Sequence, residues 1–139
     1  MQYFNKRLPQ FDKKITIDEN YDSDPVVNIN AELFEWVVEN IIKNAIDAIE
    51  NKDGKITLSL VSDPDKGSIN IEISDTGKGI NSADKKNIFK PGFSSKKRGW
   101  GLGLSLAKRI IEDYHGGKLF LKESSLGKGS VFRIVLKYE

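Results

Sequence analysis

Polar residues interrupt the otherwise apolar helical pattern of residues 31–49. Asn40, Asn44 and Asp47 lie at i, i+4 and i+7, so they share one face of a helix, and Lys43 lies beside them. Asparagine is unfavourable inside a helix because its side chain competes for backbone hydrogen bonds. The stripe is therefore either a solvated face or a site in which the neutral oxygen of Asn44 binds a hard cation such as Mg²⁺, with Lys43 facing phosphate.

A carboxylate follows directly on an alternating apolar segment that ends at Ile73. When ionised, Asp75 can only accept hydrogen bonds. It could bind the exocyclic amine of adenine, whereas the carbonyl oxygen of guanine would leave it without a partner. Gly77 and Gly79 would let the backbone pass close to the base. The alternative is an Asp-Thr-Gly turn without a ligand.

Glycines are concentrated at residues 99–103, directly before a second helical pattern. Free amides at a helix N-terminus attract anions, and glycine lets a phosphate approach them. The segment before these glycines is basic and contains Lys90, Lys96, Lys97 and Arg98. A flexible surface loop would have the same composition, so the pattern alone leaves both interpretations open.

Other nucleotide-binding signatures are absent from the sequence. No Gly-Lys pair is followed by Ser or Thr, which excludes the P-loop signature. No Gly-x-Gly-x-x-Gly follows a strand, which argues against a dinucleotide-binding fold. The His-Arg-Asp and Asp-Phe-Gly signatures of the common protein kinases are also missing.

The elements that position these residues can be predicted from apolar spacing. Apolar residues at three- and four-residue steps predict a helix over residues 31–49, which ends at residues 51–54. Alternation predicts two antiparallel strands over residues 56–60 and 69–73, joined by a turn at residues 63–67.

The rest of the chain is predicted to contain a second helix and three further strands. The segments are a weak edge strand at residues 14–17, a loop at 20–25, a glycine-rich irregular region at 75–103, a helix at 104–114, and strands at 119–122 and 131–136. One helical layer on one antiparallel or mixed sheet is the economical packing of such elements, an α+β sandwich.

Composition indicates one soluble domain. The chain has 139 residues, of which 38% are hydrophobic and 30% charged, a net charge of +2 and no cysteine. The charge balance gives no case for binding nucleic acid or a membrane surface. No apolar run approaches the roughly 18 residues of a membrane span, and no signal peptide opens the chain. We expect a cytoplasmic domain at residues 14–139 after a tail or connector at residues 1–13, within a parent protein that could be membrane-anchored.

Taken in order, these pieces resemble the GHKL superfamily, which includes gyrase, MutL and the sensor histidine kinases. The similar segments are NIIKNAIDA at residues 40–48 (N box), DTGKGI at 75–80 (G1 box), IFKPGFSSK at 88–96 (F box), GWGLGL at 99–104 (G2 box) and GKGS at 127–130 (the last glycine box). The F box and the Tyr-His-Gly-Gly sequence at residues 114–117 point to the histidine kinase branch.

The resemblance implies a Bergerat-type fold, a two-layer α+β sandwich with helices on one face of a mixed, mostly antiparallel sheet. It implies ATP and Mg²⁺ as cofactors, with Asp75 binding the adenine amine and Asn44 holding the metal. Asn40 and Lys43 would act beside the phosphates. The nucleotide-binding residues implied in this way are Asn40, Asn44, Asp47, Asp75, Gly77, Gly79, Ile80, Gly99, Gly101, Leu102, Gly103, Leu104 and Ser130.

One position separates the branches of this superfamily. Where the ATPase relatives carry a glutamate that activates water, this chain has Asn40, which cannot act as a general base. Glu39 is adjacent but points about 100° away around the helix. The resemblance therefore implies that ATP is kept for transfer and is not hydrolysed rapidly.

The chain contains one histidine, His115, at a helix end where the resemblance implies a structural role. The expected partners are a dimerisation segment of the same protein that carries the phosphoacceptor histidine, and a downstream response regulator. The alternatives are an anti-sigma-type serine kinase and a nucleotide-binding regulatory domain without phosphotransfer. Residues 81–100 lack a long apolar pattern and hold five lysines, so we expect a mobile lid that a triphosphate orders.

Overall fold

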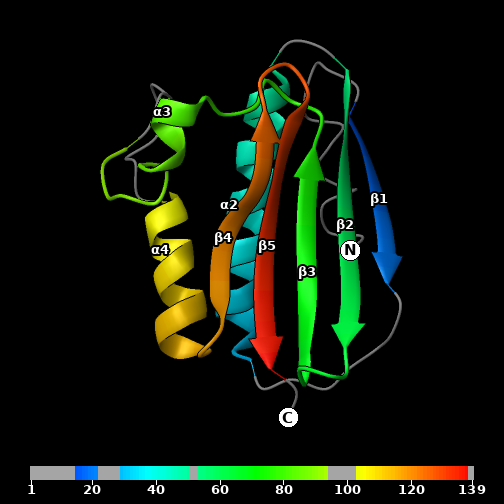
Figure 1. The fold of residues 1–139 in the computed structure, drawn as a ribbon, viewed down its shortest axis with the longest axis vertical. Coiled ribbons are helices and arrows are strands. Elements are labelled where there is room, and N and C mark those ends of the chain that lie inside the picture. The colour runs from blue at the N-terminus through cyan, green and yellow to red at the C-terminus, as the bar shows by residue number, and fades with distance from the viewer. Residues whose placement is uncertain (1–14, 22–28, 51–52, 94–102, 138–139) are drawn as a thin grey trace.

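The protein forms a five-stranded mixed sheet that is covered on one face by helices (Figure 1). The computed structural model describes residues 15–21, 29–50, 53–93 and 103–137. The strands are β1 (Ile15–Tyr21), β2 (Gly54–Asp63), β3 (Ser68–Asp75), β4 (Lys118–Ser125) and β5 (Gly129–Lys137). Their order is β1-β2-β3-β5-β4, and β1 pairs in parallel with β2 whereas the other pairs are antiparallel.

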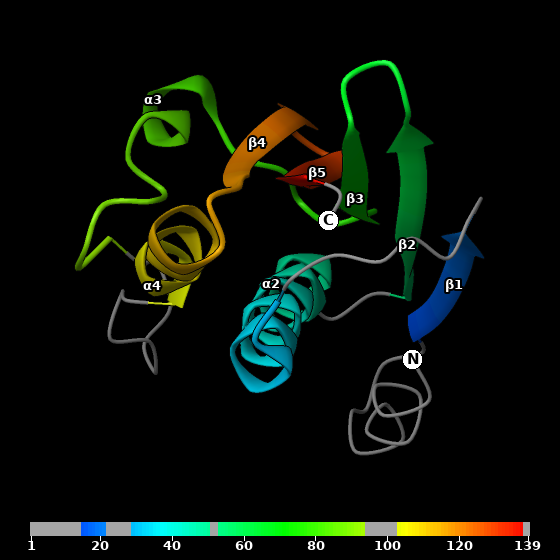
Figure 2. The ribbon, with the colours of Figure 1, turned by 90° about the horizontal axis from the view of Figure 1, so that it is seen from below.

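The helical layer consists of α2 (Ala31–Ile49) and α4 (Gly103–Arg109), and α4 continues as a π-helical turn, η2 (Ile110–Tyr114). Seen along the layers, both helices lie on the same side of the sheet (Figure 2). α2 contacts β2, β3 and β5, while α4 contacts β4 and α2. The predicted α+β architecture, with helices on one face of a mixed and mostly antiparallel sheet, is confirmed.

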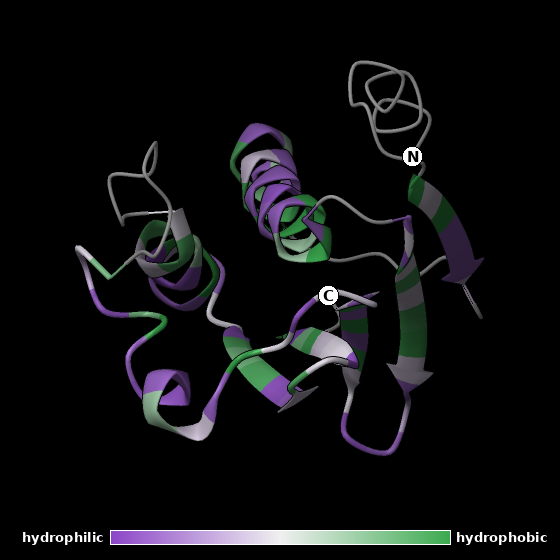
Figure 3. Cartoon of the chain, turned by 90° about the horizontal axis from the view of Figure 1, so that it is seen from above, coloured by the Kyte–Doolittle hydropathy of each residue, from purple (hydrophilic) through white to green (hydrophobic). Residues whose placement is uncertain are grey.

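The core lies between these two layers. Bands of hydrophobic residues alternate with hydrophilic ones along α2 and along the strands (Figure 3). The helix side chains that the core buries recur at the spacing predicted from the sequence: Val37, Val38, Ile41, Ile42, Ala45, Ile46 and Ile49. The alternating strand residues Ile56, Leu58, Ile69, Ile73, Phe132, Ile134 and Leu136 face them and are also buried.

Both ends of α2 have a local cause. The side chain of Asn30 caps the N-terminus by accepting a hydrogen bond from the Leu33 amide at 3.0 Å. The helix ends at Glu50, which has a φ of +62°, and whose amide bonds to the Asp47 carbonyl at 3.1 Å. The predicted helix over residues 31–49 is thus confirmed residue for residue.

Two predictions about the region outside the main helices need correction. β1 extends through Asn20 and Tyr21, which were predicted to be loop, because parallel pairing with Ser59 and Leu60 of β2 holds them in the sheet. The region predicted as irregular contains a short helix, α3 (Ser82–Lys85). Its N-cap, Asn81, accepts a hydrogen bond from the Asp84 amide at 2.8 Å.

The second predicted helix is present, but its last five residues, Ile110–Tyr114, are π-helical. The Gly117 amide closes this wide turn by bonding to the Ile111 carbonyl at 3.0 Å. Gly116 makes the reversal possible with a φ of +64°, a conformation that residues with a side chain rarely adopt.

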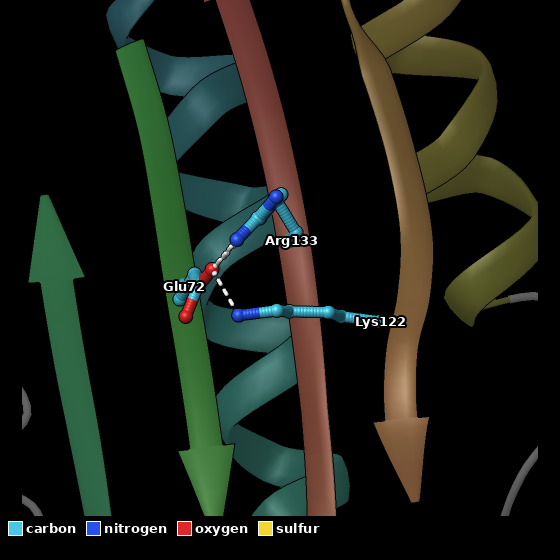
Figure 4. A network of polar contacts seen from close by, with 3 residues as sticks. All are labelled: Glu72, Lys122 and Arg133. Carbon is cyan, nitrogen blue, oxygen red and sulfur yellow. Dashed lines mark hydrogen bonds and ion pairs between the residues drawn. The ribbon is translucent and has the colours of Figure 1, made fainter. Parts of the chain in front are cut away.

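The open face of the sheet carries an ion cluster across three strands (Figure 4). Glu72 on β3 accepts hydrogen bonds from Arg133 on β5, with Nε at 2.7 Å, and from Lys122 on β4, with Nζ at 3.1 Å. Burial raises the pKa of the Glu72 carboxyl, but the hydrogen bonds from Arg133 and Lys122 outweigh it and hold that pKa below its ordinary value.

Among the described residues, no helix has the length and apolarity needed to cross a membrane.

Candidate functional site

The carboxylate of Asp75 lies at the end of β3, where it is only 9% exposed. Its Oδ1 accepts a hydrogen bond from the Gly77 amide at 2.8 Å, and the Ser130 amide on β5 also donates to the carboxylate. Burial raises the pKa of Asp75, and the two backbone amides offset this only in part. The two amides hold the group in place, and its remaining acceptor capacity suits a donor such as an amine.

The turn after Asp75 packs directly on α2. The Lys78 amide donates to the Ala48 carbonyl at 2.8 Å. A Cβ on Gly77 would lie 2.7 Å from the backbone of Ala48, which is closer than any side chain permits. The predicted adenine-binding residue is therefore fixed against the C-terminal part of the helix that carries Asn44 and Asp47.

The same turn also packs on the hairpin between β4 and β5. Gly79 has a φ of +80°, and a Cβ there would lie 2.2 Å from the Ser125 carbonyl oxygen. Similarly, a Cβ on Gly129 would lie 1.9 Å from the Asp75 carbonyl oxygen. Protein backbone therefore occupies the space that a side chain on Gly77 or Gly79 would need. The prediction that these glycines let the backbone pass close to a base stays a prediction.

The polar stripe of α2 faces the start of α4 at one position. Asn40 donates from Nδ2 to the Trp36 carbonyl at 2.8 Å, and its Oδ1 lies 3.2 Å from the position that a Cβ on Gly103 would occupy. The structure thus brings the N box and the end of the G2 box together. Lys43 is exposed and forms an ion pair with Glu39 at 3.4 Å.

The other predicted site residues divide into two groups. Asn44 is half-buried and Asp47 exposed on α2, and both Ile80 and Leu104 pack against the core. Gly99, Gly101 and Leu102 lie outside the described residues, as do Trp100, Lys96, Lys97 and Arg98 of the predicted lid.

Residues 29–139 match the protein family described as histidine kinase-, DNA gyrase B- and HSP90-like ATPases. The chain belongs to this family. Since these are ATPases, membership implies that the domain binds ATP, and it confirms the GHKL resemblance.

Similar proteins place this ATPase domain in the histidine kinase branch. Sporulation kinase C of Bacillus subtilis is 38% identical over 124 residues, which is 88% of this chain and 28% of that protein. The Escherichia coli histidine-protein kinase AtoS is 38% identical over 111 residues, which is 79% of this chain and 17% of that protein. The chain therefore spans less than a third of either relative.

Solved structures agree with the fold of this ATPase domain. The nucleotide-free catalytic domain of histidine kinase ThkA superposes with a TM-score of 0.80 at 28% identity. The superposition covers 99% of this chain and 88% of that one. The resemblance to the ATP-binding domain of a sensor histidine kinase is thus confirmed.

Two residues of this ATPase domain were missed by sequence reasoning. Ser124 on β4 has a buried hydroxyl that accepts a hydrogen bond from the Ile80 amide at 2.8 Å and lies 2.7 Å from the Ser130 hydroxyl. Lys108 on α4 donates to the Leu119 carbonyl at 2.8 Å and to Glu112 at 3.0 Å, and lies 4.9 Å from the centre of the Phe89 ring in the F box. The contacts that link these residues to the predicted boxes, Ser124 with Ile80 and Lys108 with Phe89, join positions that are distant in the sequence, so no local spacing marks them.

His115 of the ATPase domain lies at the opposite end of α2 from Asp75. Its Nε2 accepts a hydrogen bond from the Asn30 amide at 3.0 Å, so the ring proton is on Nδ1, which donates to the Ile110 carbonyl at 2.9 Å. The ring also meets Phe34 edge-on, with 6.5 Å between centroids. These contacts tie η2 to the cap of α2, which is a structural role.

A shallow depression of about 460 Å³ also lies at this end, lined by Ile29, Asn30, Leu33, Tyr114 and His115. None of the residues predicted to bind the nucleotide lines it. We place the candidate site at Asp75, a buried acceptor whose turn packs on the end of α2; the polar stripe of the same helix meets the start of α4 at Asn40.

Proposed function

We propose that this domain binds Mg²⁺-ATP and donates the γ-phosphate to a histidine on a separate dimerisation segment of its parent two-component sensor kinase. The observation that carries the proposal is the buried Asp75 carboxylate, which two backbone amides hold beside α2. A buried carboxylate without a ligand is unfavourable, and a hydrogen-bond donor such as the adenine amine would compensate for its lost hydration.

In this proposal, Asp75 binds the adenine amine, with Gly77, Gly79 and Ile80 forming the turn that holds it. The amides of Gly101 and Gly103 bind phosphate, Gly99 also contributes to nucleotide binding, and Leu102 and Leu104 shape the pocket. Transfer of a phosphoryl group requires positioning and charge neutralisation more than covalent chemistry from the protein. Amides and lysines meet that requirement.

The residues present are compatible with a magnesium ion. Within the described ranges, no three His, Cys, Asp or Glu side chains gather into a metal-binding group. Mg²⁺ in nucleotide sites commonly binds one or two protein oxygens together with phosphate oxygens. Asn44 would supply such an oxygen, with Asp47 one helical turn away. The bound ion would neutralise charge on the triphosphate.

The residues of α2 favour transfer over hydrolysis. Asn40 cannot act as a general base, and its amide is held by the Trp36 carbonyl. The neighbouring Glu39 is ion-paired with Lys43. In the proposed complex, Lys43 would exchange this pair for the phosphates, and Asn40 would lie beside them.

The proposed partners are the phosphoacceptor segment of the same parent protein and a downstream response regulator, in the cytoplasm. We propose no nucleic acid partner and no direct membrane contact for this domain, since its net charge is only +2. The parent protein could itself be membrane-anchored.

The decisive experiment combines the purified chain with the phosphoacceptor segment of its parent protein and γ-labelled ATP. We expect an acid-labile, base-stable label on the acceptor histidine, and no label on His115 when the chain is incubated alone. Asp75→Asn serves as the inactive control. An acid-stable label on a serine would instead show a serine kinase, and ATP binding without any label would show a purely regulatory domain.

A further inference from the structure

The hydroxyl of Ser124 connects three segments at the adenine end of the candidate site. Ser124 is 9% exposed, and its Oγ lies 2.8 Å from the Ile80 amide, 2.7 Å from the Ser130 hydroxyl and 3.2 Å from the Gly129 carbonyl. Ile80 belongs to the turn after Asp75, and Ser130 donates its amide to the Asp75 carboxylate. The Ser124 side chain on β4 thus links the turn that follows β3 to the start of β5.

A β-bulge is what brings Ser124 to this position. Leu119 and Leu121 of β4 pair with Ile134 and Phe132, and the register then shifts by one residue between Leu121 and Glu123. Because of the shift, Ser124 pairs with Ser130. If the register did not shift, Glu123 would pair with Ser130, which would bring its carboxylate next to the buried Asp75. Bulges of this kind re-aim side chains beside functional sites.

The bulge also explains where Lys122 lies. The extra residue of β4 is released to the open face, where its ammonium bonds to Glu72 at 3.1 Å (Figure 4). The ion pair fixes the irregular residue on one face while Ser124 is buried on the other. Specific contacts therefore hold the bulge on both faces of the sheet.

The hydrogen-bond capacity of Ser124 determines the proton position on Ser130. A hydroxyl has one proton and two acceptor sites. All three contacts can be hydrogen bonds together only if Ser124 accepts from the Ile80 amide and the Ser130 hydroxyl and donates to the Gly129 carbonyl. In that arrangement the Ser130 proton is engaged by Ser124, and only lone pairs remain on the Ser130 oxygen.

We infer that Ser124 is a positioning residue that sets base specificity: by engaging the Ser130 proton, it makes Ser130 an acceptor beside Asp75 and so favours adenine over guanine. Adenine presents an amine at the position where guanine presents a carbonyl oxygen. Two acceptors beside that position suit the amine and repel the carbonyl. This inference rests on the proposed function, because it assumes that a purine binds at Asp75.

The test compares the affinities of Mg²⁺-ATP and Mg²⁺-GTP, each measured by competition against a fluorescent ATP analogue. Ser124→Ala frees the Ser130 proton, which can then donate to the guanine carbonyl. We expect the ATP-over-GTP preference to fall about 3- to 10-fold, the size of one neutral hydrogen bond. Ser125→Ala is the matched control, because Ser125 is the exposed neighbour at the end of the same strand, and the ATP-over-GTP preference of this variant should match that of the wild type.

A double-mutant cycle with Ser130→Ala identifies the route of the effect. If Ser124 acts through Ser130, then Ser124→Ala should leave the preference unchanged in the Ser130→Ala background. A loss of both affinities in equal proportion would overturn the inference, since it would show a merely structural residue. An effect that persists without the Ser130 hydroxyl would overturn it as well.

Folding of each variant is checked by thermal unfolding. If Ser124→Ala does not fold, Ser124→Cys keeps the side-chain volume and replaces the hydroxyl with a weakly bonding thiol, and the preference should fall in the same direction. Failure of the wild type to bind ATP would refute the proposed function instead. Normal ATP binding with an unchanged preference in both variants refutes only the role of Ser124.

Discussion

The amide oxygen of Asn40 on α2 lies 3.2 Å from the position that a side chain on Gly103, at the start of α4, would have to occupy. Asn40 cannot easily turn away, because its Nδ2 is bonded to the Trp36 carbonyl at 2.8 Å. A side chain at residue 103 would therefore require Asn40 to shift by a few tenths of an ångström. This contact joins the N box and the G2 box, which were each predicted to lie beside the phosphates.

We predict that Gly103→Ala weakens ATP binding with little change in stability. The added methyl group displaces Asn40, while alanine loses less conformational entropy on folding than glycine does, which offsets part of the cost of the contact. Calorimetric titration with Mg²⁺-ATP and thermal unfolding would measure the two effects. If the contact with Asn40 is the cause, the double variant Asn40→Ala/Gly103→Ala should bind ATP as tightly as Asn40→Ala alone.

Asp75→Asn should reduce ATP affinity about 10- to 150-fold, since a hydrogen bond to a charged group contributes about 1.5–3 kcal/mol. Calorimetry on the folded variant measures this directly. Unchanged affinity would exclude Asp75 as the adenine-binding residue.

The same variant should be at least as stable as the wild type at pH 7. Burial raises the pKa of Asp75 above that of the unfolded chain, so ionisation of this group destabilises the folded state at neutral pH. This destabilisation disappears as the pH falls through the raised pKa. The stability advantage of Asp75→Asn should therefore shrink on acidification, as denaturant unfolding at several pH values would show. An advantage that grows towards low pH would contradict the assigned direction of the shift.

Asn44→Ala should abolish the enhancement of ATP affinity by Mg²⁺. The substitution removes the amide oxygen that we propose as the metal ligand, and it leaves a good helix former in its place. The measurement is the ratio of ATP affinities with Mg²⁺ and with chelator. A variant that keeps the wild-type ratio would show that the metal is held elsewhere.

Lys108→Met should lower the free energy of unfolding by about 1 kcal/mol. It removes the bond from the ammonium to the Leu119 carbonyl and the ion pair with Glu112, and it loosens the base of the F box at Phe89. Arg109→Met on the same helix is the control, because Arg109 and its partner Asp113 are largely exposed and 3.9 Å apart. Chemical denaturation should separate the two variants. Equal effects would mean that Lys108 has no role beyond an ordinary surface ion pair.

Local spacing was sufficient for the elements that depend on their own periodicity. The bounds of α2, its polar stripe and the central residues 69–73 of β3 follow from repeats of 3.6 and two residues, which any core-facing helix or strand must obey. The order of the glycine-rich segments was also sufficient for the family, because the order belongs to the sequence itself.

Tertiary structure decided the features that depend on pairing between distant segments. Asn20 and Tyr21 are strand because they pair with β2, and Ser124 faces Ser130 because a bulge shifts the register of β4. Gly77 and Gly79 are glycine because Ala48 and Ser125 occupy the space that a side chain would need. Such contacts join residues up to several tens of positions apart. Their hydrogen-bond geometry and close packing exist only once the sheet and the helical layer have formed, so no spacing along the chain records them.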